Sequence, residues 1–372
     1  MLEKGKISPR QMGELLAMIM ISTAILFVPS FTVKLLGQDA WLAILLGAGF
    51  GVVTLYFVYQ LGERHHGQTI FQYAEHLLGK WLGKLVGLIY IWTFLRVVAI
   101  VIREFGAFMT TSFMPNTPLS VFTFSIVLLS AWAVMAGLEV IARMNEFLIL
   151  LVVTSLVAVL ALSMGNWDLG SLQPLFAADL LLLLETATIP EIWKVDTITI
   201  AVIMPFITRP KRVLIAGTVA TLSAGALLAI GIIGTLAIFG PQLLPTFRFP
   251  LIMFVRTINI AQILSRFEVV VMVVWVAGAF LKTTYFLYCA SLGFAQITGL
   301  KEYRPVVFPL GVIATVWSFS LFENIADLEK AISTPSLRSY FIYLGLPVFL
   351  LLVTIVREKF FGVSFGGEEK YE

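Results

Sequence analysis

A lysine and an aspartate lie two residues apart in the apolar stretch Leu181–Ile207, within the motif Trp193-Lys194-Val195-Asp196. Pro190 precedes this motif and Pro205 follows it. A proline removes a helix hydrogen bond, and ionisable residues are rarely placed against lipid. At a helix break, exposed N–H groups suit a carboxylate, whereas an acidic side chain and freed carbonyl groups suit an ammonium group. The motif could therefore contact the charged groups of a ligand.

A second interruption lies in the first apolar stretch, where Ser22-Thr23-Ala24 is followed by Pro29. Small and polar residues before a proline predict a helix break whose N–H groups contact the carboxylate of the ligand. The alternative is that Pro29 and Pro205 only kink ordinary helices.

Asp196 has two possible roles. Its carboxylate could bind the ammonium group of a ligand, or it could form a structural ion pair with Lys194 or Arg103. The bulk of the Trp193 side chain favours a small or partly closed pocket. The predicted substrate-binding residues are Ser22, Thr23, Ala24, Trp193, Val195 and Asp196.

Further charged residues lie inside apolar stretches. Arg96 and Arg103 are seven residues apart and therefore share a helix face, and Glu104 follows directly. Such charges almost always face the protein interior. We expect Arg96, Arg103, Glu104 and Lys194 to form an internal charge network.

The hydrophobic and charged fractions of the chain indicate which kind of structure holds these residues in place. Of the 372 residues, 59% are hydrophobic and only 13% are charged, and the mean hydropathy is +0.96. A soluble domain carries roughly 25% charged residues, so lipid must be the solvent of this chain. Apolar runs of about 20 residues predict transmembrane helices and not the shorter alternating strands of a barrel. The sequence therefore predicts an all-α polytopic membrane protein.

Long apolar stretches bounded by Gly, Pro and charge predict about ten spans. They are Met12–Leu36, Trp41–Leu61, Leu85–Ser112, Leu119–Leu138, Phe147–Ser163, Leu181–Ile207, Val213–Phe239, Val269–Ile297, Pro305–Leu321 and Tyr340–Val356. The loops on one side carry most of the Lys and Arg, which predicts that both termini are cytoplasmic.

The interrupted spans, one and six, are five spans apart. An odd interval inverts the second half, so we expect a five-plus-five inverted repeat with broken first and sixth helices. The chain would be one transmembrane permease-like domain over 1–372, with repeats at 1–165 and 166–360 and a cytoplasmic tail at 361–372.

Several classes of function have no support in the sequence. The net charge of +3 is too small to indicate nucleic-acid binding, and one cysteine, Cys289, cannot form a disulfide framework. The sequence has no nucleotide-binding loop and no His pair at metal-ligand spacing. We expect no enzyme activity, no cofactor and no metal site.

The second half carries a set of residues that together form a recognisable pattern: Pro250, Arg256, Ile258-Asn259-Ile260, Arg266, Glu268, Trp275, Tyr303-Arg304-Pro305 and Phe308-Pro309. In these residues the chain resembles spore germination permeases of the GerAB type. Further similarity lies in Ile7–Gln11, Leu78–Tyr90, Met114–Pro118 and Arg209–Arg212, so that the resemblance covers essentially the whole chain. The family belongs to the amino-acid/polyamine/organocation superfamily, whose fold has broken first and sixth helices.

The resemblance implies a germinant-sensing, permease-like subunit of a receptor in the inner spore membrane. It would bind a small amino acid or similar solute beside a large membrane subunit and a lipoprotein. Departures from the family motifs, Ser22-Thr23-Ala24 and Val195, leave the identity of the ligand open. The alternatives are a secondary amino-acid transporter, proton-linked or without ion coupling, and a scaffold subunit that binds nothing.

The resemblance also gives Lys282 a possible role. Sodium-coupled proteins of this fold hold sodium with small hydroxyl residues of the eighth span, and Thr283 and Thr284 follow Lys282 in this chain. The ammonium group of Lys282 could replace that ion. The alternative is a lysine that forms an ion pair in the bundle or extends to the interface.

Overall fold

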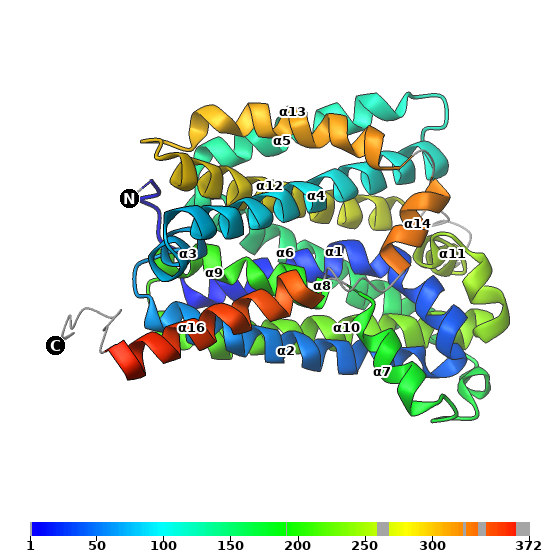
Figure 1. Ribbon diagram of the computed structural model, residues 1–372. Coiled ribbons are helices and arrows are strands. Elements are labelled where there is room, and N and C mark those ends of the chain that lie inside the picture. Colours follow the sequence, from blue (N-terminus) through cyan, green and yellow to red (C-terminus); the bar gives the residue numbers. More distant parts are fainter. Residues whose placement is uncertain (1, 191, 259–267, 323–324, 334–339, 362–372) are drawn as a thin grey trace.

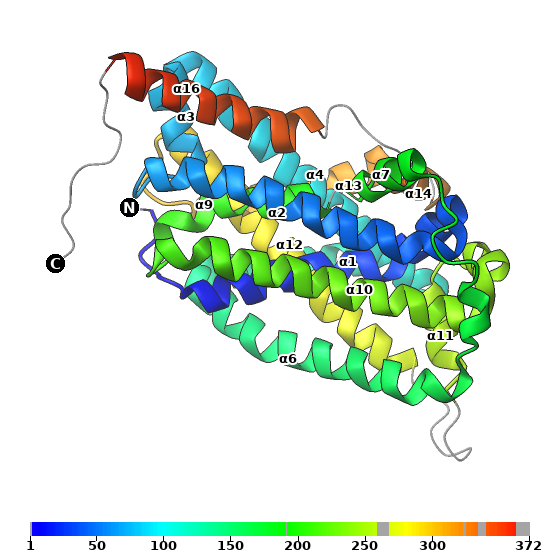
Figure 2. The same ribbon diagram turned by 90° about the horizontal axis from the view of Figure 1, so that it is seen from below.

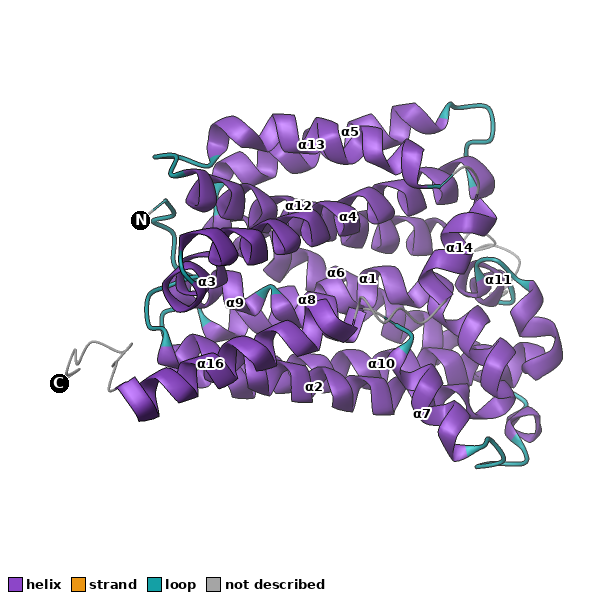
Figure 3. Cartoon of the chain, in the orientation of Figure 1, coloured by secondary structure: helices purple, strands orange, loops and turns teal. Residues whose placement is uncertain are grey.

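A computed structural model describes residues 2–190, 192–258, 268–322, 325–333 and 340–361 as a bundle of long helices (Figures 1 and 3). The two perpendicular views show that these helices run along a common direction (Figure 2). Within the described ranges, the structure has no β-strand beyond one isolated bridge between Ile7 and Ile207. The all-α architecture predicted from the composition is confirmed.

The long helices match the predicted spans. They are α1 Pro9–Leu36, α2 Ala40–Arg64, α4 Lys80–Ser112, α5 Leu119–Ala136, α6 Leu138–Ser163, α10 Val213–Leu243, α12 Glu268–Thr298, α13 Arg304–Leu321 and α16 Leu346–Phe361. The short helices are α3 Ile70–Leu78, α7 Leu180–Thr188, α8 Ile192–Ile198, α9 Ile200–Ile203, α11 Pro250–Arg256 and α14 Ile325–Ser333. A π-helix, Phe341–Gly345, leads into α16.

Eight helical stretches in the described part of the chain are long and apolar enough to cross a membrane. One of them, Pro9–Arg64, contains two helices, α1 and α2, and the interrupted sixth span adds one more crossing. The structure therefore agrees with about ten spans. α1 begins and α16 ends at the same end of the bundle, as an even number of crossings requires (Figure 1).

The first span corrects one expectation, because α1 is continuous through Ser22-Thr23-Ala24. Ser8 caps its start by accepting a hydrogen bond from the Gln11 N–H, and Gly37, with φ of 58°, follows its end. The Ser22 hydroxyl donates to the Ile19 carbonyl at 3.2 Å, so the polar side chain is satisfied within the helix. Without glycine in this motif, the backbone keeps its helical hydrogen bonds.

The sixth span is interrupted, but earlier than the sequence indicated. α7 ends at Thr188, and Ile189 and Pro190 separate it from α8. The motif Trp193–Asp196 is therefore helical and lies in α8. Pro190 lacks the N–H that would continue α7, which accounts for the position of the break.

Trp193 packs α8 against α2 and α10. Its buried indole lies in a notch between Gly47 of α2 and Gly225 of α10, and Gly51 of α2 lies against its backbone carbonyl and Cβ atom. A methyl group on Gly47 would lie 2.5 Å from the indole nitrogen, a distance that real side chains do not tolerate. The notch fixes α8, and with it Val195 and Asp196.

The buried carboxylate of Glu3 fastens the N-terminal segment to the end of the bundle where α1 begins. Glu3 accepts hydrogen bonds from the backbone N–H groups of Lys4 and Gly5, both at 2.8 Å, and of Leu138 at 3.2 Å. Leu138 is the first residue of α6, where a helix favours negative charge. The segment thereby joins the start of α1 to the start of α6.

Two tyrosine hydroxyls complete this carboxylate site. Tyr288 of α12 donates to Glu3 at 3.4 Å, and Tyr303 donates at 3.2 Å. Burial and the neighbouring carboxylate raise the pKa of Tyr303 above its usual range, so its hydroxyl stays protonated and keeps donating. Ile7, four residues after Glu3, also holds the N-terminal segment in place. Its N–H donates to the Phe206 carbonyl, in the segment after α9, at 2.9 Å.

Glu3→Gln should loosen this segment. The amide nitrogen of glutamine accepts no hydrogen bond, and each lost charge-assisted bond costs about 1.5–3 kcal/mol. We expect faster limited trypsin cleavage after Lys4 and Lys6 in the purified variant. Glu139→Gln is the control, since Glu139 forms an exposed ion pair with Arg143 that contributes little. Equal cleavage rates in both variants would contradict a fastening role for Glu3.

Candidate functional site

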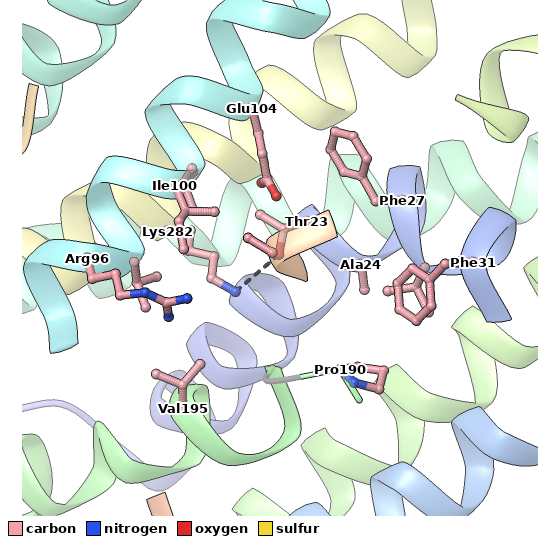
Figure 4. Close-up of a pocket in the computed structure, with 14 residues that line it drawn as sticks. Thr23, Ala24, Phe27, Phe31, Arg96, Ile100, Glu104, Pro190, Val195 and Lys282 are labelled. Carbon is pink, nitrogen blue, oxygen red and sulfur yellow. Dashed lines mark hydrogen bonds between the residues drawn. The ribbon is translucent and has the colours of Figure 1, made fainter. Parts of the chain in front are cut away.

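Lys282 of α12 joins three helices at the centre of the bundle. Its ammonium group donates to the Ile19 carbonyl at 2.9 Å and to the Thr23 hydroxyl at 3.1 Å, both in α1. It also forms an ion pair with the Asp196 carboxylate of α8 at 3.0 Å. The contact with Thr23 is drawn in Figure 4.

The three contacts use the full capacity of the ammonium group, which has three N–H donors. Lys282 and Asp196 are buried, with 3% and 0% of their side chains exposed. Charges removed from water are tolerated when they are paired and hydrogen-bonded. The pair therefore places α1, α8 and α12 in one fixed arrangement.

Asp196 forms an internal ion pair, one of the two arrangements considered from the sequence, but its partner is Lys282 and not Lys194 or Arg103. The lysine beside it in sequence, Lys194, instead donates to the Thr188 carbonyl at 2.8 Å and lies 4.0 Å from the centre of the Tyr340 ring. Lys194 thereby bridges the interruption between α7 and α8 and contacts the start of the last span.

A cavity of about 80 Å³ lies beside this ion pair. A single water needs roughly 10–15 Å³ by this kind of measure, so the space admits a small organic solute. Its lining comes from α1, α4, α8, α12, α14 and Pro190 (Figure 4). The lining residues are Thr23, Ala24, Phe27, Val28, Phe31, Arg96, Val97, Ile100, Val101, Glu104, Pro190, Val195, Lys282 and Ala331.

Glu104 is the unsatisfied polar group of this lining. Only 3% of the residue is exposed, and its Oε2 atom has no hydrogen-bond partner in the described part of the chain. A buried polar atom without a partner costs free energy, which makes Glu104 a candidate contact for a hydrogen-bond donor in the cavity. Arg96, eight residues earlier on α4, lines the same cavity.

The structure divides the predicted substrate-binding residues into two groups. Thr23, Ala24 and Val195 line the cavity. Ser22, Trp193 and Asp196 are not part of the lining. Ser22 instead faces Gly278 of α12, where a methyl group would lie 2.3 Å from the serine Cβ. The bulk of Trp193 fills its glycine notch and does not narrow the cavity.

The residues predicted to replace a coupling ion, and those predicted to form a charge network, also lie in different surroundings. Lys282 reaches α1 and α8, whereas the hydroxyls of Thr283 and Thr284 are buried and have no hydrogen-bond partner among the described residues. Arg103 points toward α13, because it donates to the Phe322 carbonyl at 3.1 Å. Arg96 and Glu104 face the cavity instead. Two of the four residues expected to form an internal charge network therefore share the wall of the cavity.

Several lining residues were missed from the sequence. Phe27 and Phe31 follow Thr23 at intervals of four, so a single face of α1 carries all three. This spacing was a usable signal. Phe27 also contacts Phe249, with ring centres 5.4 Å apart, and Phe249 contacts Phe108 at the same distance. This aromatic cluster closes the bundle beside the cavity.

Comparisons with known proteins connect the chain to one family. A family model described as "Spore germination protein" matches residues 6–326. The chain is 25% identical over 375 residues to spore germination protein KB of Bacillus subtilis (strain 168), covering 99% of this chain and 100% of that protein. It is 22% identical to spore germination protein GerQB of Bacillus cereus, covering 94% and 96% of the two chains.

Solved transporters share the fold. A nucleobase-cation-symport-1 family transporter, MHP1, in a closed conformation with bromovinylhydantoin bound matches with a TM-score of 0.67 and 13% identity, over 93% of this chain and 78% of that chain. MhsT in complex with L-phenylalanine matches with a TM-score of 0.65 and 16% identity, over 95% and 90%. At these identities the likeness shows the fold alone.

Removing one partner of the Lys282–Asp196 pair should be far more harmful than removing both charges. Lys282→Met leaves a buried carboxylate unpaired, which costs about 3–5 kcal/mol. We expect a large loss of thermal stability in this variant and a smaller one in the double variant Lys282→Met/Asp196→Asn. The single variant Asp196→Asn completes the set, and all are measured in the same detergent. A double variant whose loss equals the sum of the single losses would show that the two charges are not coupled.

Proposed function

Because the chain belongs to the spore germination protein family, we propose that it is the germinant-sensing, permease-like subunit of a spore germinant receptor and that its central cavity binds a free amino acid. The family model covers most of the chain, and the fold is that of solved transporters. In this proposal the transporter fold supplies a solute site between helices that can shift, and occupation of the site produces a signal.

The Oε2 atom of Glu104, buried at the cavity without a donor among the described residues, is the observation on which the ligand proposal depends. The Oδ1 atom of Asp196 also lacks a hydrogen-bond partner there, but Asp196 forms an ion pair with Lys282 at 3.0 Å and does not line the cavity. Glu104 is buried at the cavity and its Oε2 atom lacks a donor among the described residues. An ammonium group supplies both the charge and the N–H donors that this atom requires.

The opposite charge of the ligand has a partner on the same helix. Arg96 lines the cavity, and a guanidinium group suits a carboxylate because it can donate two parallel hydrogen bonds. Figure 4 shows its guanidinium group and the Glu104 carboxylate on different sides of the Lys282 ammonium group. We assign the ligand carboxylate to Arg96 and the ligand ammonium to Glu104.

The same proposal places the protein in the inner spore membrane with both termini in the cytoplasm. Its support is the excess of Lys and Arg in the loops at that end. The expected partners are a large membrane subunit and a lipoprotein of the receptor, together with the bilayer. The domain bounds proposed for the repeats remain 1–165 and 166–360.

A secondary amino-acid transporter is the second candidate, and the L-phenylalanine complex of a protein with this fold favours it. The ammonium group of Lys282 lies between α1 and α12, where it would take the place of a coupling cation. Uptake would then be proton-linked or without ion coupling, and independent of sodium. Accumulation of labelled amino acids in proteoliposomes separates transport from sensing alone.

Glu104→Gln should weaken amino-acid binding while the protein still folds. Loss of one charge-assisted hydrogen bond in a dry site costs about 1.5–3 kcal/mol, or roughly tenfold to a hundredfold in Kd. The measurement is binding of a panel of L-amino acids and of the matching 2-hydroxy acids, which lack the ammonium group. The unmodified protein should prefer the amino acid of each pair, and the variant should lose that preference.

Glu185→Gln is the matched control for this experiment, because Glu185 is exposed on α7 and does not line the cavity. It should bind the panel as the unmodified protein does. Unchanged amino-acid affinity in a well-folded Glu104→Gln protein would remove Glu104 from the site and with it the proposed mode of binding.

A further inference from the structure

Two segments that are far apart in the sequence lie side by side at the end of the bundle where α1 begins. The Ile7 N–H donates to the Phe206 carbonyl, and the Thr208 N–H donates to the Ile7 carbonyl, both at 2.9 Å. The Ile7 side chain is fully buried. Figure 2 shows the N-terminal segment at the same end of the bundle as the start of α10. This backbone pairing holds the residues on either side of it next to each other.

Exposed basic side chains flank the pairing on both segments. Two precede Ile7 and three follow Thr208, and we call this set of five the basic patch. It consists of Lys4, Lys6, Arg209, Lys211 and Arg212. Within the described ranges, none of these five side chains forms an ion pair with a carboxylate. The patch therefore carries positive charge that the described part of the protein does not neutralise.

Three acidic residues near the patch are already engaged. Glu3 accepts hydrogen bonds from backbone N–H and tyrosine hydroxyl groups. Glu14 pairs with Arg10 at 2.7 Å, and Glu139 pairs with Arg143 at 2.6 Å. A concentration of like charges on a surface attracts counter-charge from its surroundings. The anions that neutralise the patch therefore come from outside the protein.

The patch lies at the edge of the lipid-facing surface. α10 begins at Val213, directly after Arg212, and exposes Ile215, Val219 and Leu222. These three residues are spaced by four and by three, so they form one apolar stripe on the helix, which faces the hydrocarbon of the bilayer. The patch precedes this stripe, at the level where hydrocarbon gives way to charged headgroups. Lipid phosphates are already present at this level, whereas an acidic protein would have to reach it from the water.

We propose that the basic patch binds the phosphate groups of anionic phospholipids and so holds the start of α1 against the end of the sixth span. Clusters of roughly four to eight Lys and Arg beside a transmembrane helix bind anionic headgroups. The arginines suit a phosphate because a guanidinium group donates two parallel hydrogen bonds, and the lysines add point charges. The inference needs only a bilayer that contains anionic lipid, so it is independent of the solute that the central cavity binds.

The lipid site reinforces an outer contact between the two spans that Lys282 joins at the centre. Ile7 lies two residues before α1, and Phe206 ends the 3₁₀ turn that follows α9. At the centre, Lys282 contacts Thr23 of α1 and Asp196 of α8. Separation of the first and sixth spans at this end of the bundle thus requires release of the lipid as well as of the backbone pairing. Because a ligand shifts a protein toward the conformation that it binds better, anionic lipid favours the paired arrangement.

The first measurement is the affinity of phosphatidylglycerol and of phosphatidylcholine for the purified full-length protein in detergent, obtained by native mass spectrometry. The unmodified protein should prefer phosphatidylglycerol by roughly tenfold or more. A triple variant without the basic residues before α10, Arg209→Gln/Lys211→Gln/Arg212→Gln, should lose this preference. Each basic residue near an anionic surface contributes roughly fivefold in affinity, so three lost charges outweigh it.

The matched control is Lys80→Gln/Lys301→Gln/Lys359→Gln. It removes the same charge from exposed residues at the start of α4, in the loop after α12 and near the end of α16. This variant should bind phosphatidylglycerol as the unmodified protein does. An equal loss in both triple variants would show a general effect of charge and overturn the patch as a site. Displacement of the lipid by excess inorganic phosphate would identify a site for free phosphate and overturn the assignment to lipid.

The second measurement is hydrogen–deuterium exchange of the Ile7 and Thr208 amide groups, whose hydrogen bonds form the backbone pairing. Exchange should be several-fold slower in nanodiscs of phosphatidylglycerol than in nanodiscs of phosphatidylcholine. The difference should vanish in the variant that lacks the basic residues before α10 and persist in the control. Equal exchange in the two lipids overturns the proposal and leaves an acidic protein as the occupant of the patch. If that triple variant fails to fold, Lys4→Gln/Lys6→Gln, which alters only the N-terminal segment, decides in its place.

Discussion

The contacts of one ammonium group on α12 with two other helices determine the arrangement of the site. Lys282 satisfies its three donors with Ile19, Thr23 and Asp196, and so links α12 to α1 and α8. Nothing in hydrocarbon can replace these acceptors, because the alternative is an unpaired charge in a medium without water. The interrupted sixth span and the continuous first span therefore meet in one defined register.

The same contact decides which carboxylate remains for a ligand. Asp196 and Glu104 are both buried, but only Asp196 lies within hydrogen-bond distance of Lys282. Glu104 lines the cavity with an oxygen that has no donor within the described ranges. Asp196 is thus paired with a lysine of the protein, and Glu104 is the carboxylate that we propose for ligand binding.

Much of the fold followed from the sequence, and less of the site did. The length of the apolar stretches predicted the helices, and the depth of Lys282 in its span marked it as internal. The motif at Ser22 predicted a helix break that α1 does not have, because hydrogen bonds that the sequence alone does not reveal keep this helix intact. Arg103 and Glu104 are neighbours in sequence but point to different sides of α4, and only the packing of α4 in the bundle, mainly against α12, selects the one that faces the cavity. Ala331 had no local signal, since it reaches the site through the packing of α14.

An experimental structure of the protein with a bound L-amino acid tests the central claim most directly. The account predicts that the ligand nitrogen lies within about 3 Å of a Glu104 carboxylate oxygen, an ordinary charge-assisted hydrogen bond. The contact between Lys282 and Asp196 should persist in that complex. A ligand nitrogen bound to Asp196, with Lys282 displaced from it, would contradict the account.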